Sequence, residues 1–285
     1  MFKNMKKLII LFAALAACAA AAAQTTPEEF QVRYERLVRN LGYDGVGIET
    51  LLDRWEEAFP EDRSVPVARF NYWFHKSQWS EVVPKGSQRK FLGNPPTVSL
   101  KDADGQDVNY FEETFYDEEA FGEAIKIAET MIAAQPNELR WHYLKISALS
   151  AYEKESPDMA AKEIKELIAR DAQAHPAWTL DGESAGSEAF QRGMAEYCAD
   201  FFQLGTDLGY EYFRDISERM NKIYPKNPVF IDNIGSWWLI VKGNDKQAAK
   251  YYKKALQLDP NDYAATQNLR IIERRQAAAK NTKKK

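Results

Sequence analysis

The sequence predicts an all-α fold built from consecutive helical hairpins, interrupted by one irregular insertion. Three observations lead to this prediction. Apolar residues recur at intervals of three and four, which places them on one face of an α-helix. Prolines close successive periodic segments, where a helix can no longer continue. The stretch 83–117 is rich in proline, glycine, asparagine and aspartate and has no helical period.

Residues 1–23 are predicted to be a secretory signal peptide that takes no part in the fold. Lys3, Lys6 and Lys7 form a positive segment, an apolar run follows, and small residues continue to Ala23. The apolar run is short for a helix that spans a bilayer, so we expect cleavage rather than a retained anchor. The protein is therefore predicted to be exported from a bacterial cytoplasm, to the periplasm or the outer membrane.

Two outcomes of signal processing remain open. The three alanines before Gln24 suit an ordinary signal peptidase. The segment Leu15-Ala16-Ala17-Cys18 also resembles the lipobox of bacterial lipoproteins, in which the Cys18 thiol would be acylated. A lipid on Cys18 is the only membrane attachment that we expect.

The N-terminal half is predicted to hold a helical hairpin at 24–62 and a second unit at 63–136. In the first, apolar positions precede a glycine-rich turn and then Pro60. In the second, a helix is expected at 67–74 and helix resumes near Glu118. Between them, Asp104-Gly105 lies among short alternating segments, which predicts a β-hairpin inside the insertion.

The C-terminal half is predicted to continue with units at 137–176, 177–227 and 228–262. The stretch 177–186 is a second irregular segment. A capping helix with a basic tail is expected at 263–285. In units 137–176 and 177–227, the residues that recur at helical spacing, and so share one face of each expected helix, are Trp141, Leu144, Ala148, Leu149, Ala160, Ile164, Leu167, Ile168, Phe190, Gly193, Met194, Tyr197, Phe213, Ile216, Met220 and Ile223.

The unit 228–262 has the most regular pattern. Its first helix is expected to bury Ile231, Ile234, Gly235 and Trp238 on one face, with the glycine allowing close approach of another helix. Its second helix repeats a small–aromatic–small pattern on one face, at Ala248, Tyr252 and Ala255.

This unit resembles the tetratricopeptide repeat. That family pairs a W-x-x-L-G-x-x-Y helix with an A-x-x-x-F/Y-x-x-A helix and a closing proline, here Pro260. The spacing from Pro225 to Pro260 is 35 residues, against about 34 in the family, and we expect the extra residue in the turn. Upstream units share only the periodicity of helical hairpins. The resemblance implies a right-handed solenoid.

The resemblance also implies where a partner binds. In tetratricopeptide arrays the first helices of the hairpins line a groove that recognises peptides or protein segments. By register, the groove positions of unit 228–262 are Asp232, Ser236 and Trp237, with Leu239 and Ile240 nearby. The comparable positions of unit 137–176 are His142, Lys145 and Ile146. Adjacent tryptophans cannot face the same way on a helix. We therefore expect Trp237 to point to the groove or its edge if Trp238 packs in the core.

The implied function is a non-catalytic scaffold or adaptor in the cell envelope that binds an unidentified protein or peptide. Two other classes remain open: a receptor for a glycan or small ligand that uses exposed aromatic rings, and an enzyme with its site in 83–117. Converging carboxylates or histidines would favour the enzyme. Flat exposed rings would favour the glycan receptor, and an open groove the adaptor.

No motif in the sequence predicts catalysis, a metal or another cofactor. His75, His142 and His175 lie in different units without a second ligand at helical spacing. The segment from Asp102 places Glu113 at the twelfth position of a calcium loop, but Asp107 stands where that loop needs glycine. A structural hairpin is the favoured interpretation.

Net charge limits the class of partner, and the cysteine count limits disulfide formation. Removal of three lysines with the signal lowers the formal net charge from −4 to −7, and this acidic balance argues against a nucleic-acid partner. Cys198 is the only cysteine of a chain cleaved after Ala23, so no intrachain disulfide is expected. Its aromatic neighbours predict a buried thiol.

Overall fold

The computed structural model describes residues 26–282, with side chains up to residue 278. The predicted signal peptide 1–23 and Cys18 lie outside these residues. Within them the chain forms eleven helices and five strands. This confirms the predicted all-α fold of helical hairpins with a β-containing insertion. Two compact units are present, and each is described separately below.

The first unit contains the described residues up to Ser77 together with Glu118–Ala124. Its helices are α2 (Pro27–Leu41), α3 (Ile48–Ala58), α4 (Ser64–Lys76) and the first residues of α5 (Glu118–Ala134). The Thr26 hydroxyl caps α2 by accepting a hydrogen bond from the Glu29 N–H at 3.3 Å. Ile48, Leu52 and Trp55 of α3 are almost fully buried and form the centre of the core of this unit.

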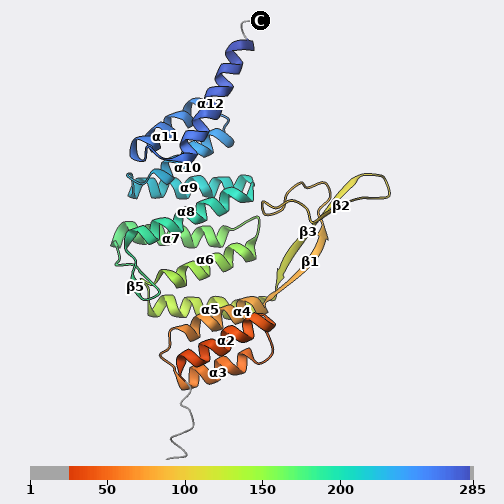
Figure 1. Cartoon of the computed structure of the whole chain (residues 1–285), viewed down its shortest axis with the longest axis vertical. Coiled ribbons are helices and arrows are strands. Elements are labelled where there is room, and N and C mark those ends of the chain that lie inside the picture. Colours follow the sequence, from red (N-terminus) through yellow and green to blue (C-terminus); the bar gives the residue numbers. More distant parts are fainter. Residues whose placement is uncertain (1–25, 283–285) are drawn as a thin grey trace, which may run out of the picture. The chain divides into compact units, whose positions relative to one another are not determined.

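The second unit contains the remaining helices, and helices that follow each other in sequence pack against one another in pairs (Figure 1). They are α6 (Leu139–Glu153), α7 (Asp158–Ala174), α8 (Gly186–Leu204), α9 (Asp207–Ile223), α10 (Pro228–Ile240), α11 (Asp245–Leu258) and α12 (Tyr263–Thr282).

The closing prolines mark the ends of helices across both units. Each lies two residues beyond the last residue of a helix, at Pro60, Pro136, Pro176, Pro225 and Pro260. Proline cannot donate the backbone hydrogen bond that a further turn needs. These helix ends are therefore predictable from local chemistry alone.

The pair α10–α11 has the packing predicted for unit 228–262. Ala248, Tyr252 and Ala255 of α11 are fully buried, and Ile231 and Ile234 of α10 are buried too. A Cβ added at Gly235 would lie 2.9 Å from Tyr252 Cε1. The absence of a side chain at Gly235 thus sets the distance between the two helices.

The insertion is a three-stranded antiparallel sheet in the order β1-β3-β2. Its strands are β1 (Gln78–Pro84), β2 (Val98–Lys101) and β3 (Asp107–Tyr116). The predicted hairpin at Asp104-Gly105 is present, and the Asp102 carboxylate accepts hydrogen bonds from the Asp104 and Gln106 N–H groups. The insertion begins at Gln78, not at 83. Sequence periodicity missed β1 because its partner strand lies far along the chain.

The second irregular stretch, 177–186, holds two-residue strands β4 (Thr179–Leu180) and β5 (Glu183–Ser184). The buried Glu138 carboxylate anchors it by accepting hydrogen bonds from the Thr179 hydroxyl and the Asp181 and Gly182 N–H groups. Burial acts to raise the pKa of Glu138, but these hydrogen bonds to its charged form lower it below its usual value.

We expect Gly235→Ala to destabilise the protein by about 1–3 kcal/mol, because the new methyl group overlaps the Tyr252 ring in a packed interface. Urea denaturation followed by circular dichroism measures this change. Gly122→Ala is the matched control: Gly122 lies inside α5, and a Cβ added there meets nothing within 4 Å. That variant should be as stable as the parent or gain up to about 1 kcal/mol from helix propensity. Equal effects of the two changes would contradict the role assigned to Gly235.

Candidate functional site

One face of α10 combines exposed apolar and polar side chains. Val229, Asp232, Ser236 and Ile240 are spaced so that they fall within one sector of the helix. Val229 is 42% exposed and Ile240 is 52% exposed, although neighbouring positions of α10 are buried. Ser236 is half-buried, and its Oγ lies 3.2 Å from the Tyr252 hydroxyl. This face offers both apolar contact and hydrogen-bonding groups.

Asp232 is the unusual member of this face. Its side chain is 8% exposed, and within residues 26–278 its Oδ1 atom has no hydrogen-bond partner. Burial, with a smaller effect from the Asp262 carboxylate, raises the pKa of Asp232 to about 7. A buried acceptor without a donor is costly to the folded state. The structure therefore holds an acidic group that a hydrogen-bond donor would stabilise.

Trp237, which the sequence led us to expect at the groove or its edge, is covered in this structure. Its ring is only 5% exposed. The Arg214 guanidinium lies 4.8 Å from the ring centroid, and the Lys242 ammonium lies 5.1 Å from it. Because α10 packs against both α9 and α11, both adjacent tryptophans are covered, Trp237 almost fully and Trp238 in part. Trp237 is a packing residue in this structure.

His142 and Lys145, the candidates on α6, both have partners inside the protein. His142 Nε2 lies 3.0 Å from the Pro136 carbonyl oxygen, and burial lowers the pKa of His142. Lys145 forms ion pairs with Glu163 at 2.8 Å and Glu129 at 3.0 Å. Burial acts to lower the pKa of Lys145, but hydrogen bonds to these carboxylates raise it. Both side chains already have structural roles.

The candidates from the sequence do not form one cluster. His142, Lys145 and the buried Ile146 belong to α6, which packs on α7, whereas the other candidates belong to α10, which packs on α9 and α11. Leu239 is also buried. Of the residues predicted to face a ligand, Ile240 is exposed, Asp232 is buried, and the half-buried ones are Ser236, His142 and Lys145.

A slot at the insertion was not predicted from sequence. It has a volume of about 430 Å³, within the range of ligand sites. Its walls come from β3, from the loop before β2 and from the C-terminal end of α6. The lining residues used below are Phe91, Leu92, Phe111, Glu112, Thr114 and Lys154. Two of them, Leu92 and Lys154, adopt positive φ angles, which non-glycine residues seldom do.

Glu113, beside this slot, is neutralised by two lysines. Lys154 Nζ lies 2.5 Å from one carboxylate oxygen, and Lys85 Nζ lies 2.7 Å from the other. Burial acts to raise the pKa of Glu113, but the two lysines lower it below its usual value. The twelfth position of the calcium loop considered above is thus bound to lysines. The sequence signal that could have found this region is the proline pair Pro95-Pro96 just before β2, because proline has no N–H with which to continue a ladder.

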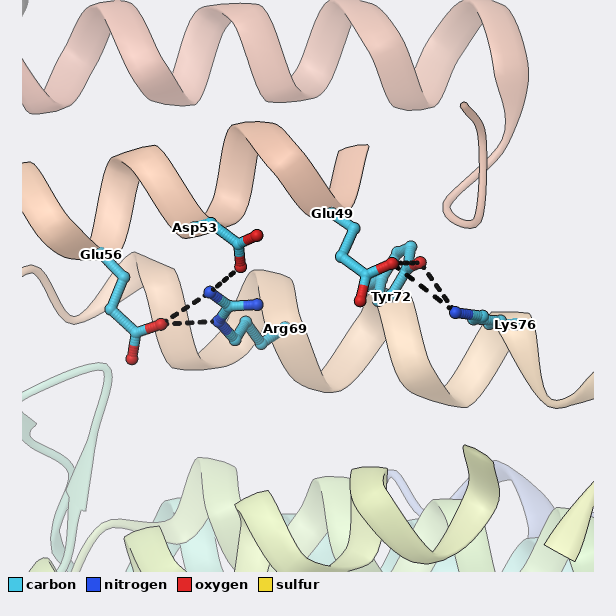
Figure 2. A network of polar contacts seen from close by, with 6 residues as sticks. All are labelled: Glu49, Asp53, Glu56, Arg69, Tyr72 and Lys76. Carbon is cyan, nitrogen blue, oxygen red and sulfur yellow. Dashed lines mark hydrogen bonds and ion pairs between the residues drawn. The ribbon is translucent and has the colours of Figure 1, made fainter. Parts of the chain in front are cut away.

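A separate polar network joins α3 and α4 in the first unit (Figure 2). Arg69 of α4 contacts Asp53 and Glu56 of α3, each at 2.7 Å. One turn further along α4, the Tyr72 hydroxyl donates to Glu49 at 2.7 Å, and Lys76 lies 3.1 Å from that hydroxyl. Every charge in this network faces an opposite charge or a hydroxyl. We assign it to the packing of the two helices.

The remaining reactive groups are also satisfied within the fold. Cys198 is buried as predicted, and burial raises the pKa of its thiol to about 12. His75 stacks on Tyr43, with centroids 4.3 Å apart, and His175 ends α7 in a left-handed conformation. No group of three histidine, cysteine or acidic side chains in the described part of the chain is arranged to hold a metal ion. None of the described helices is long and apolar enough to span a bilayer.

No protein-family model matches the chain, and no curated protein matches its sequence.

We expect Asp232→Asn to stabilise the protein at pH 8 and to have little effect near pH 4. The folded-state pKa of Asp232 is about 7, above its ordinary value of 3.8. The folded state therefore binds the proton more tightly than the unfolded state. The stabilisation that comes from this tighter proton binding is complete below pH 3.8 and is lost as the pH rises to about 7.

A pKa that is higher by one in the folded state than in the unfolded state corresponds to about 1.4 kcal/mol, so we expect the variant to gain about 1–3 kcal/mol at pH 8. Urea titrations of both proteins at pH 4, 6 and 8 measure the difference. Glu218→Gln is a control, because Glu218 is exposed on α9. A difference between Asp232→Asn and its parent that does not vary with pH would contradict the assignment.

Proposed function

We propose that this protein is a non-catalytic adaptor of the tetratricopeptide type that binds a peptide or protein segment along α10. The observation that carries the proposal is the face of α10 on which Val229 and Ile240 are exposed beside Ser236 and the unpartnered Asp232 carboxyl oxygen. Exposed apolar side chains flanking unsatisfied polar groups are typical of a binding surface. The close packing of Gly235 on Tyr252 supports the family assignment, since it matches the repeat signature.

The chemistry of this face favours a segment with both apolar and hydrogen-bond-donating groups. Ile240 and Val229 would contact apolar side chains of the partner. Ser236 and Asp232 would accept hydrogen bonds from its N–H groups. No cofactor or nucleic acid enters this proposal, and the acidic balance of the mature chain is consistent with that.

The place of action follows from the N-terminal sequence. We propose export to the bacterial cell envelope, in soluble form if cleavage follows Ala23 or tethered to a membrane if Cys18 is acylated. Either form leaves α10 available to a partner in the envelope. Mass spectrometry of the mature N-terminus distinguishes the two, because a chain beginning at Gln24 carries no lipid on Cys18.

Site-specific photocrosslinking in living cells tests the binding face. We expect a benzoylphenylalanine residue at Ile240 to give one discrete protein adduct, because this side chain would touch the partner. The same probe at Lys253, exposed on α11, is the matched control and should give none. Western blotting of envelope fractions and mass spectrometry of the adduct provide the measurement.

A second substitution tests the apolar contact without a probe. Ile240→Asp should reduce recovery of the identified partner at least tenfold while the circular dichroism spectrum stays unchanged. Equal adducts from positions 240 and 253, or none from position 240, would refute the proposed face.

A further inference from the structure

The open edge of β3 carries an inference that goes beyond the proposed function. β1 pairs with β3 along the whole of Tyr110–Tyr116, whereas β2 pairs with β3 only from Asp107 to Tyr110. Among the described residues, no strand continues along β3 at Glu112 and Thr114 on the side where β2 lies. These two residues instead line the slot of about 430 Å³.

The hydrogen-bond pattern shows where their backbone groups point. The Lys85 N–H donates to the Asn109 carbonyl, so odd-numbered residues of β3 face β1. The Thr97 N–H donates to the Tyr110 carbonyl, so even-numbered residues face the side of β2. Because this alternation continues along an antiparallel ladder, the backbone groups of Glu112 and Thr114 point into the slot.

The chain itself is prevented from filling this position. The Thr97 hydroxyl accepts a hydrogen bond from the Glu112 N–H at 3.3 Å, where a strand would have offered a carbonyl. Pro96 and Pro95 precede Thr97, and proline has no N–H with which to continue a ladder. The pairing of β2 therefore ends at Thr97. The Glu112 carbonyl and both backbone groups of Thr114 remain available for a strand from outside.

The floor of the slot suits an apolar side chain, while the exposed carboxylate of Glu112 lies at its edge. Phe91 and Phe111 form an apolar floor, with ring centroids 5.9 Å apart. Glu113 lies beside the slot, but its charge is neutralised by the two lysines described above. A segment with an apolar side chain directed at the floor would bury that side chain there.

The loop that forms one wall is fixed in place. Gly93, at φ +78°, packs so closely that a Cβ would lie 2.6 Å from the Gln203 carbonyl oxygen at the end of α8. Phe91 and Asn94 exchange backbone hydrogen bonds of 2.9 Å. The slot is thus largely formed before a ligand arrives, which lowers the entropy cost of binding.

We propose that this slot binds a short extended peptide segment of a partner protein, which adds to β3 as a strand in line with β2. Backbone hydrogen bonds to Glu112 and Thr114 hold the segment, and an apolar side chain rests on Phe91 and Phe111. This is recognition by strand addition, in which the backbone supplies affinity and alternate side chains supply specificity.

The opposite edge of the sheet provides a matched control. Ser80 of β1 lies directly across from Thr114, and their hydroxyl oxygens are 3.3 Å apart. By the same alternation the Ser80 N–H points outward, away from β3. Thr114→Pro and Ser80→Pro therefore each remove one N–H that the ladder between β1 and β3 does not use, and each loses the contact between the hydroxyls. Only Thr114→Pro alters the edge that faces the slot.

Peptide selection followed by titration tests the proposal. The full mature chain is panned against a phage-displayed library of random heptapeptides, and an enriched peptide is labelled for fluorescence anisotropy. We expect Thr114→Pro to weaken its binding at least tenfold, the effect of losing about 1.4 kcal/mol of hydrogen bonding. Ser80→Pro should stay within about twofold of the parent. Asp232→Asn should also bind normally, which separates this site from the face of α10.

Changes in the peptide keep the test independent of protein folding. N-methylation at one set of alternate residues should abolish binding, and methylation at the other set should not, because a strand pairs through every second residue. Amide hydrogen exchange should show protection of the Thr114 N–H when the peptide is bound. No enriched peptide, equal loss in the two proline variants, or binding that tolerates methylation in both registers would overturn the proposal.

Discussion

The helical part of the second unit depends on small residues that let helices approach aromatic rings. Gly235 packs against the ring of Tyr252, and Gly193 of α8 packs against Tyr143 of α6, where an added Cβ would lie 2.4 Å from the hydroxyl oxygen. At both contacts a side chain in place of the glycine would push the neighbouring helix away. Hydrogen bonds tie the second contact further, since the Tyr143 hydroxyl donates to the Ala189 carbonyl and the Tyr197 hydroxyl donates to the Tyr143 carbonyl. Rigid spacing of this kind lets a repeat protein present one helix face at a fixed angle.

Most buried charge in the described part of the chain is compensated locally. Glu138 accepts backbone N–H groups, and Asp171 accepts hydrogen bonds from Trp178 Nε1 at 2.9 Å and from the Tyr224 hydroxyl at 2.6 Å. Lys145 and Arg69 each reach two carboxylates. Against this background Asp232 stands out as a buried carboxyl with an unused oxygen. Natural proteins rarely keep such a group unless something else stabilises it or uses it, and this contrast, more than exposure alone, directs attention to α10.

The two edges of the sheet in the insertion differ from each other. Its outer edge on β1 carries Pro84 at a position whose N–H would point outward, a common protection against unwanted pairing. Its other edge, on β3, carries no proline at 112–114, and the slot lies beside it. The β1 edge thus carries a proline, whereas on the β3 edge the Thr97 hydroxyl accepts a hydrogen bond from the Glu112 N–H and the slot borders Thr114. We propose that the sheet accepts a further strand only at its β3 edge. The face of α10 and this edge are two distinct surfaces.

Local sequence patterns were sufficient to predict most helices, their ends and many of the residues they bury, because these features depend on neighbours three or four residues away and on proline. The Asp104-Gly105 turn and the burial of Cys198 were predictable for the same reason. The covering of Trp237 was not, because it depends on α9 and α11 packing on two sides of one helix. Neither β1 nor the slot could be found this way, since the partners of β1 lie about thirty residues along the chain. Local chemistry thus sets the elements, whereas contacts between distant segments set which side chains and backbone edges stay open to a ligand.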